Sequence, residues 1–214
     1  MNSEERIDAQ CTKPTKRRGP SAENQRQIDD AIAARSLKIS AYSGASIPIN
    51  ESDNDTCAQY DEPGTAPPNA QYEYLNHPAD ILLHAWGDNF ISSLRNLACA
   101  MFGCITSLSS VSTDAHQSEE FGRNIAARGH DTRSLVYAFL DEWLFNFHET
   151  GFIPKDIDII DYDPHTFMIS SKGTGEVLDL TRHPRGMEVK AITYSAMKVK
   201  ETDGRCDVYV VVDI

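Results

Sequence analysis

The spacing of apolar residues changes from about 3.6 residues to 2 near the middle of the chain, and this change narrows the possible folds most. Two stretches, residues 88–108 and 132–151, place apolar side chains three and four positions apart, as amphipathic helices do. After Gly151 apolar and polar residues alternate in short runs, which is typical of strands with one buried face. Two strand-like runs precede the first helix. The order predicts an α+β fold, with two helices packed on one face of a largely antiparallel β-sheet.

Local signals mark the ends of these elements. Asp88 is placed to cap the first helix, and Gly151 is placed to end the second. The stretch ETDG, residues 201–204, predicts a hairpin turn between the last two strands. The stretch KGTGE, residues 172–176, lacks the Lys-Ser/Thr pair of a phosphate-binding loop, and we interpret it as a tight turn between strands.

The chain is long enough for one domain and a tail. With 214 residues, 40% of them hydrophobic, it can bury one core of ordinary domain size. Residues 1–68 have no sustained hydrophobic period and predict a disordered N-terminal tail, while residues 69–214 predict the α+β domain. No run approaches the roughly 20 apolar residues that span a bilayer. We expect an intracellular, cytoplasmic protein without membrane contact; the basic run KPTKRR, residues 13–18, is either solvated charge or a nuclear import signal.

Charge and cysteine content exclude several kinds of function. The formal net charge is -12, and residues 69–214 carry 12 Lys and Arg against 21 Asp and Glu, or -9. Such an acidic domain argues against strong direct nucleic-acid binding, which depends on neutralising phosphates. Cations or a basic protein surface are better partners. Five cysteines without a C-x-x-C pair suggest neither a disulfide framework nor a zinc cluster.

The chain ends on its most apolar strand, DVYVVVDI, rather than on a polar tail. Alternation places Asp213 on the face opposite the one that Val210 and Val212 share. The side chain of Asp213 and the α-carboxylate of Ile214 then lie close together, and two such charges disfavour each other's ionisation unless a cation intervenes. A third carboxylate nearby would favour a bound cation. The alternative is a solvated C-terminus after an edge strand.

Several stretches together resemble the archease family, small proteins that assist the GTP-dependent tRNA-splicing RNA ligase. They are YEYLNHPADILLHAWGDN, AMFG, LVYAFLDEWLF, HPRGMEVKAITYSAMKV and the terminal VVVDI. The resemblance runs in order from Tyr72 to Ile214 and leaves the tail outside. The family's motif before the first helix is an acid followed by His-Thr-Ala-Asp. This chain departs from it with Asn76 in place of the acid and Pro78 in place of the threonine.

The resemblance implies that Asp80, Asp213 and the terminal carboxylate of Ile214 hold a divalent metal. Three hard anionic oxygen donors suit Ca²⁺, which we expect first, or Mg²⁺ or Mn²⁺. Asp80 opens one predicted strand and Asp213 closes another, so antiparallel pairing of these strands, or simple adjacency, could bring together residues 133 positions apart (213 minus 80). On its own, Asp80 could equally be a turn aspartate bonded to its own backbone.

Other polar residues are candidates for supporting roles. His77 could orient Asp80 from behind the ligands, whereas His84 alternates with Leu83 and Ala85 and is predicted to be a strand residue rather than a ligand. By the resemblance, Lys190 is a candidate contact for the ligase or its nucleotide. His183 and Arg185 are candidates of the same kind.

The resemblance implies an accessory protein rather than an enzyme. It would bind a metal, promote guanylylation of the tRNA-splicing RNA ligase and support multiple turnover in tRNA splicing. Two alternatives remain open: a metal-dependent phosphoesterase that acts alone, and an interaction domain whose terminal carboxylates only cap a sheet.

Overall fold

The computed structural model describes residues 63–113 and 122–214, so most of the predicted tail and the basic run at residues 13–18 lie outside the described residues. The elements are, in chain order, β1 (Tyr72–His77), β2 (Asp80–Gly87), α2 (Phe90–Ile105), the short 3-10 helix η2 (Leu108–Ser110), β3 (Gly122–Arg128), α3 (Thr132–Thr150), β4 (Phe152–Asp163), β5 (Met168–Val177), β6 (Ala191–Ile192), β7 (Lys198–Thr202) and β8 (Arg205–Asp213). No helix in this part of the chain is long and apolar enough to cross a membrane.

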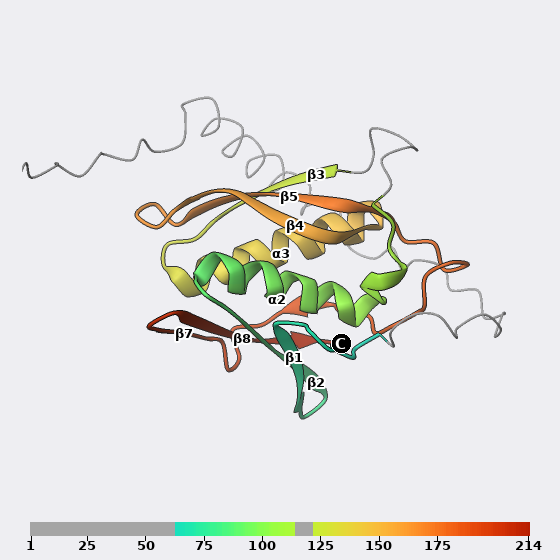
Figure 1. The fold of residues 1–214 in the computed structure, drawn as a ribbon, viewed down its shortest axis with the longest axis horizontal. Coiled ribbons are helices and arrows are strands. Elements are labelled where there is room, and N and C mark those ends of the chain that lie inside the picture. The colour runs from blue at the N-terminus through green and yellow to red at the C-terminus, as the bar shows by residue number, and fades with distance from the viewer. Residues whose placement is uncertain (1–62, 114–121) are drawn as a thin grey trace, which may run out of the picture.

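The strands form two antiparallel sheets with the helices between them (Figure 1). One sheet has the order β1-β2-β8-β6, with β7 also paired to β8; the other has the order β3-β5-β4. Helix α2 contacts β2 and β8 on one side and β4 on the other, and α3 contacts both β3 and β6. The predicted α+β class with two helices on antiparallel strands is therefore confirmed. The strands divide into two sheets rather than one, and each sheet covers the helices with one face.

Both helices begin and end at side-chain or glycine caps. Asn89 caps α2, where its side-chain oxygen accepts a hydrogen bond from Ser92 N at 2.9 Å, so the prediction of Asp88 as the cap is wrong by one position. Either residue type can cap a helix, and sequence alone does not say which one has the extended backbone that the position needs. Asp131 and Ser134 form a reciprocal capping box at the start of α3. Gly151 ends α3 in the left-handed conformation with φ 71°, as predicted.

The stretch KGTGE lies inside β5, so the prediction of a turn there is wrong. Its glycines serve close packing instead. A Cβ atom at Gly173 would lie 2.5 Å from Cη2 of Trp143, and Trp143 is fully buried in the core. The predicted hairpin between β7 and β8 is confirmed, with Gly204 in the turn at φ 76°.

Strand β8 lies inside its sheet rather than at an edge. It pairs with β2 along one side and with β7 and then β6 along the other. Val208, Val210 and Val212 are fully buried and belong to the hydrophobic core. The end of β8 is therefore paired on both sides, with Asp213 opposite Asp80 on one side and Ala191 on the other.

Candidate metal centre

Asp80 and Asp213 lie directly opposite each other in the antiparallel β2–β8 pair. His77 lies opposite Asp80 in β1–β2, and Ala191 lies opposite Asp213 in β6–β8. Directly opposed residues of antiparallel strands point to the same face. Because Val212, next to Asp213, is buried in the core, this row of His77, Asp80 and Asp213 lies on the outer face of the sheet, away from the helices.

A tight turn produces this row at the start of β2. Pro78 and Ala79 connect β1 to β2, and Ala79 has the left-handed φ of 63°. Pro78 occupies the turn, where its missing N–H is not needed by a ladder. The departure from the family motif at this position is thus compatible with the hairpin that aligns His77 and Asp80.

The ring of His77 lies beside the carboxylate of Asp80 without bonding to it. Its Nδ1 is 3.6 Å from Oδ2 of Asp80, which is too long for a hydrogen bond. This nitrogen is buried and has no hydrogen-bond partner among residues 63–113 and 122–214. A buried polar atom without a partner is uncommon, and here it stands next to a partly exposed carboxylate. The structure thus places His77 next to Asp80, and its role in orienting Asp80 stays a prediction.

Lys190 brings a positive charge to the end of the chain. Its backbone N donates to the carbonyl oxygen of Asp213 at 2.8 Å, and its Nζ donates to an oxygen of Ile214 at 2.9 Å. The side chain is exposed. The ammonium therefore offsets part of the negative charge that the carboxylate of Ile214 places next to Asp213.

The donor set fits a hard divalent ion. Within residues 63–113 and 122–214 no three His, Cys, Asp or Glu side chains gather with the spacing of a metal site. The candidate ligands are instead two side-chain carboxylates and one main-chain carboxylate, which together offer oxygen donors alone. Such donors match Ca²⁺, Mg²⁺ or Mn²⁺, with water completing the coordination shell.

His183 is buried, and both of its ring nitrogens are hydrogen-bonded within the chain. It is 2% exposed; its Nδ1 accepts from Asp179 N at 2.9 Å, so its Nε2 donates to Oε1 of Glu176 at 3.1 Å. Burial raises the pKa of Glu176, but hydrogen bonds from Arg182, the backbone N of Ser112 and His183 outweigh it and lower that pKa. The structure therefore gives His183 a buried structural role, and its candidate role as a ligase contact stays a prediction. Arg185, on the same segment, is exposed.

A second polar cluster on the outer face of the same sheet is not evident from the sequence. His84 is 7% exposed, and its ring nitrogens lie 2.7 Å from Glu73 and 2.8 Å from Asp207. Arg205 donates two hydrogen bonds to Asp207 at 2.8 and 3.0 Å. His84 also stacks on Tyr209, with ring centroids 4.1 Å apart. Only the register of three strands brings these groups together, so spacing along the chain could not have revealed them.

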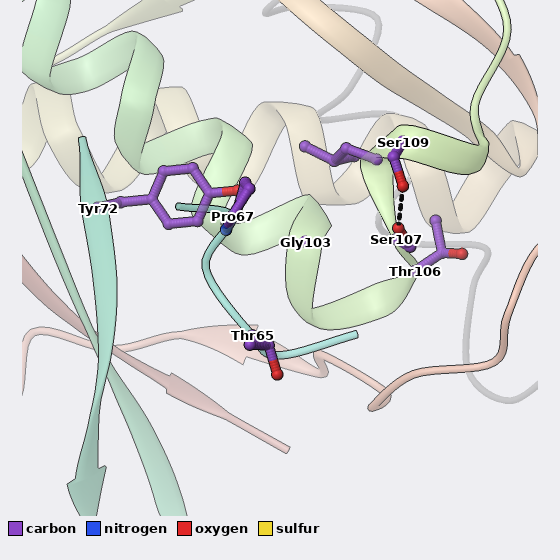
Figure 2. Close-up of a pocket in the computed structure, with 8 residues that line it drawn as sticks. Thr65, Pro67, Tyr72, Gly103, Thr106, Ser107 and Ser109 are labelled. Atoms are coloured by element: carbon purple, nitrogen blue, oxygen red, sulfur yellow. Dashed lines mark hydrogen bonds between the residues drawn. The ribbon is translucent and has the colours of Figure 1, made fainter. Parts of the chain in front are cut away.

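A small cavity lies between the segment before β1 and the C-terminal end of α2 (Figure 2). It has a volume of about 30 Å³ and is lined mainly by hydroxyl-bearing and small residues: Thr65, Pro67, Tyr72, Gly103, Thr106, Ser107, Leu108 and Ser109. This volume suits one or two water molecules rather than a nucleotide. Gly64 N donates to the carbonyl of Gly103 at 2.8 Å nearby, so packing begins before Tyr72.

Comparison with known proteins matches the described domain to one family. The model of the archease protein family matches residues 72–214. An archease-like protein of Dictyostelium discoideum is 41% identical over 143 residues, which cover 67% of this chain and 93% of that protein. The archease of Pyrococcus abyssi is 32% identical over 146 residues, covering 67% of this chain and 99% of that protein.

A solved structure has the same fold. The solution structure of a Methanobacterium thermoautotrophicum protein aligns with a TM-score of 0.54 at 26% identity. The alignment covers 68% of this chain and 99% of that one.

Proposed function

Because this chain belongs to the archease family, we propose that it is a metal-binding accessory protein of the GTP-dependent tRNA-splicing RNA ligase. It promotes guanylylation of the ligase and its repeated turnover, and it completes no reaction alone. The observation that carries the proposal is the direct pairing of Asp80 with Asp213, one residue from the carboxylate of Ile214. The two aspartates thus come from opposite ends of the domain to the same rung of one ladder, and the terminal carboxylate belongs to the residue after Asp213.

Asp80, Asp213 and the carboxylate of Ile214 would hold the metal, with Ca²⁺ the first expectation and Mg²⁺ or Mn²⁺ the alternatives. A bound divalent ion would supply positive charge for phosphate oxygens at a partner's active site. The chain's own residues have separate tasks. Asp80 and Asp213 are held in register by the β2–β8 pair, and His77 lies within 3.6 Å of Asp80 to orient it.

The position of the site on the molecule supports assistance to a partner. Asp80 and Asp213 lie on the outer face of a sheet, and the small cavity near α2 is too small for a nucleotide. The GTP and the nucleophile would therefore belong to the ligase. The formal charge of -9 over residues 69–214 also favours a protein partner over direct RNA binding.

The test is the rate of ligase guanylylation with and without this protein, in the presence of GTP and Ca²⁺ or Mn²⁺. We expect a faster rate with the protein and loss of the effect in Asp80→Ala and Asp213→Asn variants that remain folded. Asp158→Asn is the matched control, because Asp158 is an exposed strand carboxylate on the other sheet. Equal rates with and without the wild-type protein would refute the proposal.

One observation favours a second candidate, an interaction domain that needs no metal. The ammonium of Lys190 already contacts the carboxylate of Ile214 at 2.9 Å, so the terminal charge has a partner within the chain. Under this alternative, Ca²⁺ and Mn²⁺ leave thermal stability unchanged, whereas an ion that binds the native state must raise it. Guanylylation would then be stimulated equally with and without the Asp213→Asn change.

A further inference from the structure

Backbone hydrogen bonds hold residues 187–190 in place and position Lys190 beside the end of β8. Met187 N donates to the carbonyl of Cys104 at the end of α2, and His148 of α3 lies 3.1 Å from the carbonyl of Val189. Lys190 N then bonds to the carbonyl of Asp213. The Cα atom of Lys190 is thus anchored beside the candidate metal centre.

The side chain of Lys190 is much less restrained than its backbone. It is exposed, and its Nζ donates one hydrogen bond to an oxygen of Ile214 at 2.9 Å. A lysine stem has four rotatable carbon–carbon bonds, and an exposed ion pair is worth little, so the ammonium can leave at small cost. The anchored backbone keeps it within reach of the same site when it leaves.

We propose that Lys190 is a placeholder cation. Its ammonium is hydrogen-bonded to the carboxylate of Ile214 in the metal-free protein and is displaced when a divalent ion binds to that carboxylate. The inference rests on the proposed metal site. The ammonium and the metal use oxygens of the same carboxylate, and two cations at adjacent positions on it repel each other. Metal binding therefore releases a flexible ammonium next to the metal, where a phosphate of the partner's nucleotide could receive it.

This exchange predicts that Lys190 opposes metal binding, although it is a site residue. Lys190→Met keeps the length of the side chain and removes the charge. We expect Ca²⁺ affinity, measured by titration calorimetry on the full chain, to increase about three- to tenfold in this variant. Lys198→Met on β7 is the matched control, because Lys198 is exposed on the same sheet and pairs with Tyr209, away from the terminus. Its Ca²⁺ affinity is expected to equal that of the wild type.

A second measurement follows the ammonium directly. The acetylation rate of each lysine can be measured by mass spectrometry with and without saturating Ca²⁺. We expect Lys190 to react several-fold faster when Ca²⁺ is bound, while Lys198 and Lys200 react at unchanged rates. This readout requires no ligase and no activity.

The outcomes separate this inference from the proposed function. The placeholder role is overturned if Lys190→Met binds Ca²⁺ with unchanged or weaker affinity and Ca²⁺ does not accelerate the acetylation of Lys190 in the wild type. That result would still support the metal site. If neither wild type nor variant binds Ca²⁺, Mg²⁺ or Mn²⁺, the metal part of the proposed function fails and the inference fails with it.

Discussion

Asp80 and Asp213 face each other across the β2–β8 ladder, although 133 positions separate them in the chain (213 minus 80). The pairing depends on the C-terminal strand entering its sheet between β2 and the β6 and β7 strands. Both carboxylates lie at the same end of that ladder, so their separation is set by strand pairing rather than by a flexible loop. Changes at this end of the sheet should therefore act on both acids together.

A C-terminal extension should weaken metal binding. Appending residues converts the α-carboxylate of Ile214 into a neutral amide and also removes the charge that Lys190 contacts. We expect Ca²⁺ affinity to fall by about tenfold or more, equivalent to about 1.4 kcal/mol. Calorimetry on C-terminally and N-terminally tagged proteins is the measurement, with the N-terminal tag as control. Identical affinities would remove Ile214 from the set of ligands.

Bound Ca²⁺ should stabilise the folded protein, and this effect should depend on Asp80. At a free Ca²⁺ concentration of 100 times Kd, the free energy of unfolding rises by about 2.7 kcal/mol when the ion binds only the native state. We expect this increase in the wild type and in Asp158→Asn, and its loss in Asp80→Asn. Thermal unfolding with and without Ca²⁺ measures it, and an equal increase in Asp80→Asn would contradict the assignment of Asp80.

Gly173 should not tolerate a side chain. The new Cβ in Gly173→Ala would overlap Cη2 of the fully buried Trp143, and overpacking a core costs about 1–3 kcal/mol. In the control Gly122→Ala, the nearest atom is the flexible Cε of Lys172 at 3.3 Å, so we expect a much smaller loss. Urea unfolding followed by tryptophan fluorescence compares the two variants. Equal stabilities would show that Trp143 can move without cost.

His183 should matter for stability and not for assistance to a ligase. His183→Ala leaves the largely buried carboxylate of Glu176 and the backbone N of Asp179 each without one hydrogen bond. Stranded polar groups of this kind cost about 1–3 kcal/mol each. Arg185→Ala, at an exposed position of the same segment, should change stability by less than about 0.5 kcal/mol. A loss of guanylylation by folded His183→Ala, with unfolding free energy unchanged, would instead support a ligase contact at His183.

Asp207, in the cluster around His84, should make the sheet sensitive to acid at low pH. Hydrogen bonds from Arg205, opposed by burial and aided by His84, lower the pKa of Asp207 to about 2. An aspartate in the unfolded chain has a pKa of about 3.9. The stability that Asp207 contributes is therefore complete above pH 4 and is lost as pH falls from about 4 to about 2. Unfolding measured across this range should lose that dependence in Asp207→Asn, and an unaltered pH profile would contradict it.

Much of the fold could be predicted because its helices, turns and caps depend on residues that are close together in the sequence. The periods of the two helices, the glycine after α3 and the turn before β8 all depend on neighbouring residues. The sequence places Asp80 at the start of one predicted strand and Asp213 at the end of another. The resemblance to the archease family is what indicates that these two residues lie together. The choice of Asn89 over Asp88 depended on backbone conformation, which two adjacent capping residues leave undecided.

Tertiary contacts decided the remaining features. The glycines of KGTGE suggested a turn, but Gly173 lies in a strand because the ring of Trp143 needs its space. The sequence offers His183 only as a candidate contact, and its hydrogen bonds to Glu176 and Asp179 in the interior depend on the fold. The division into two sheets, and the cluster of Glu73, His84 and Asp207, arise from strand order and register. Neither is encoded by a short motif.

The central place of β8 has a mechanical consequence. A partner that grips the last residues and pulls along the strand would load the ladders to β2, β6 and β7 in shear, so their hydrogen bonds would resist together rather than open one after another. In many proteins the chain terminus detaches first under force. Here the terminal strand is paired on both sides, so a force applied to it is transmitted to the whole sheet.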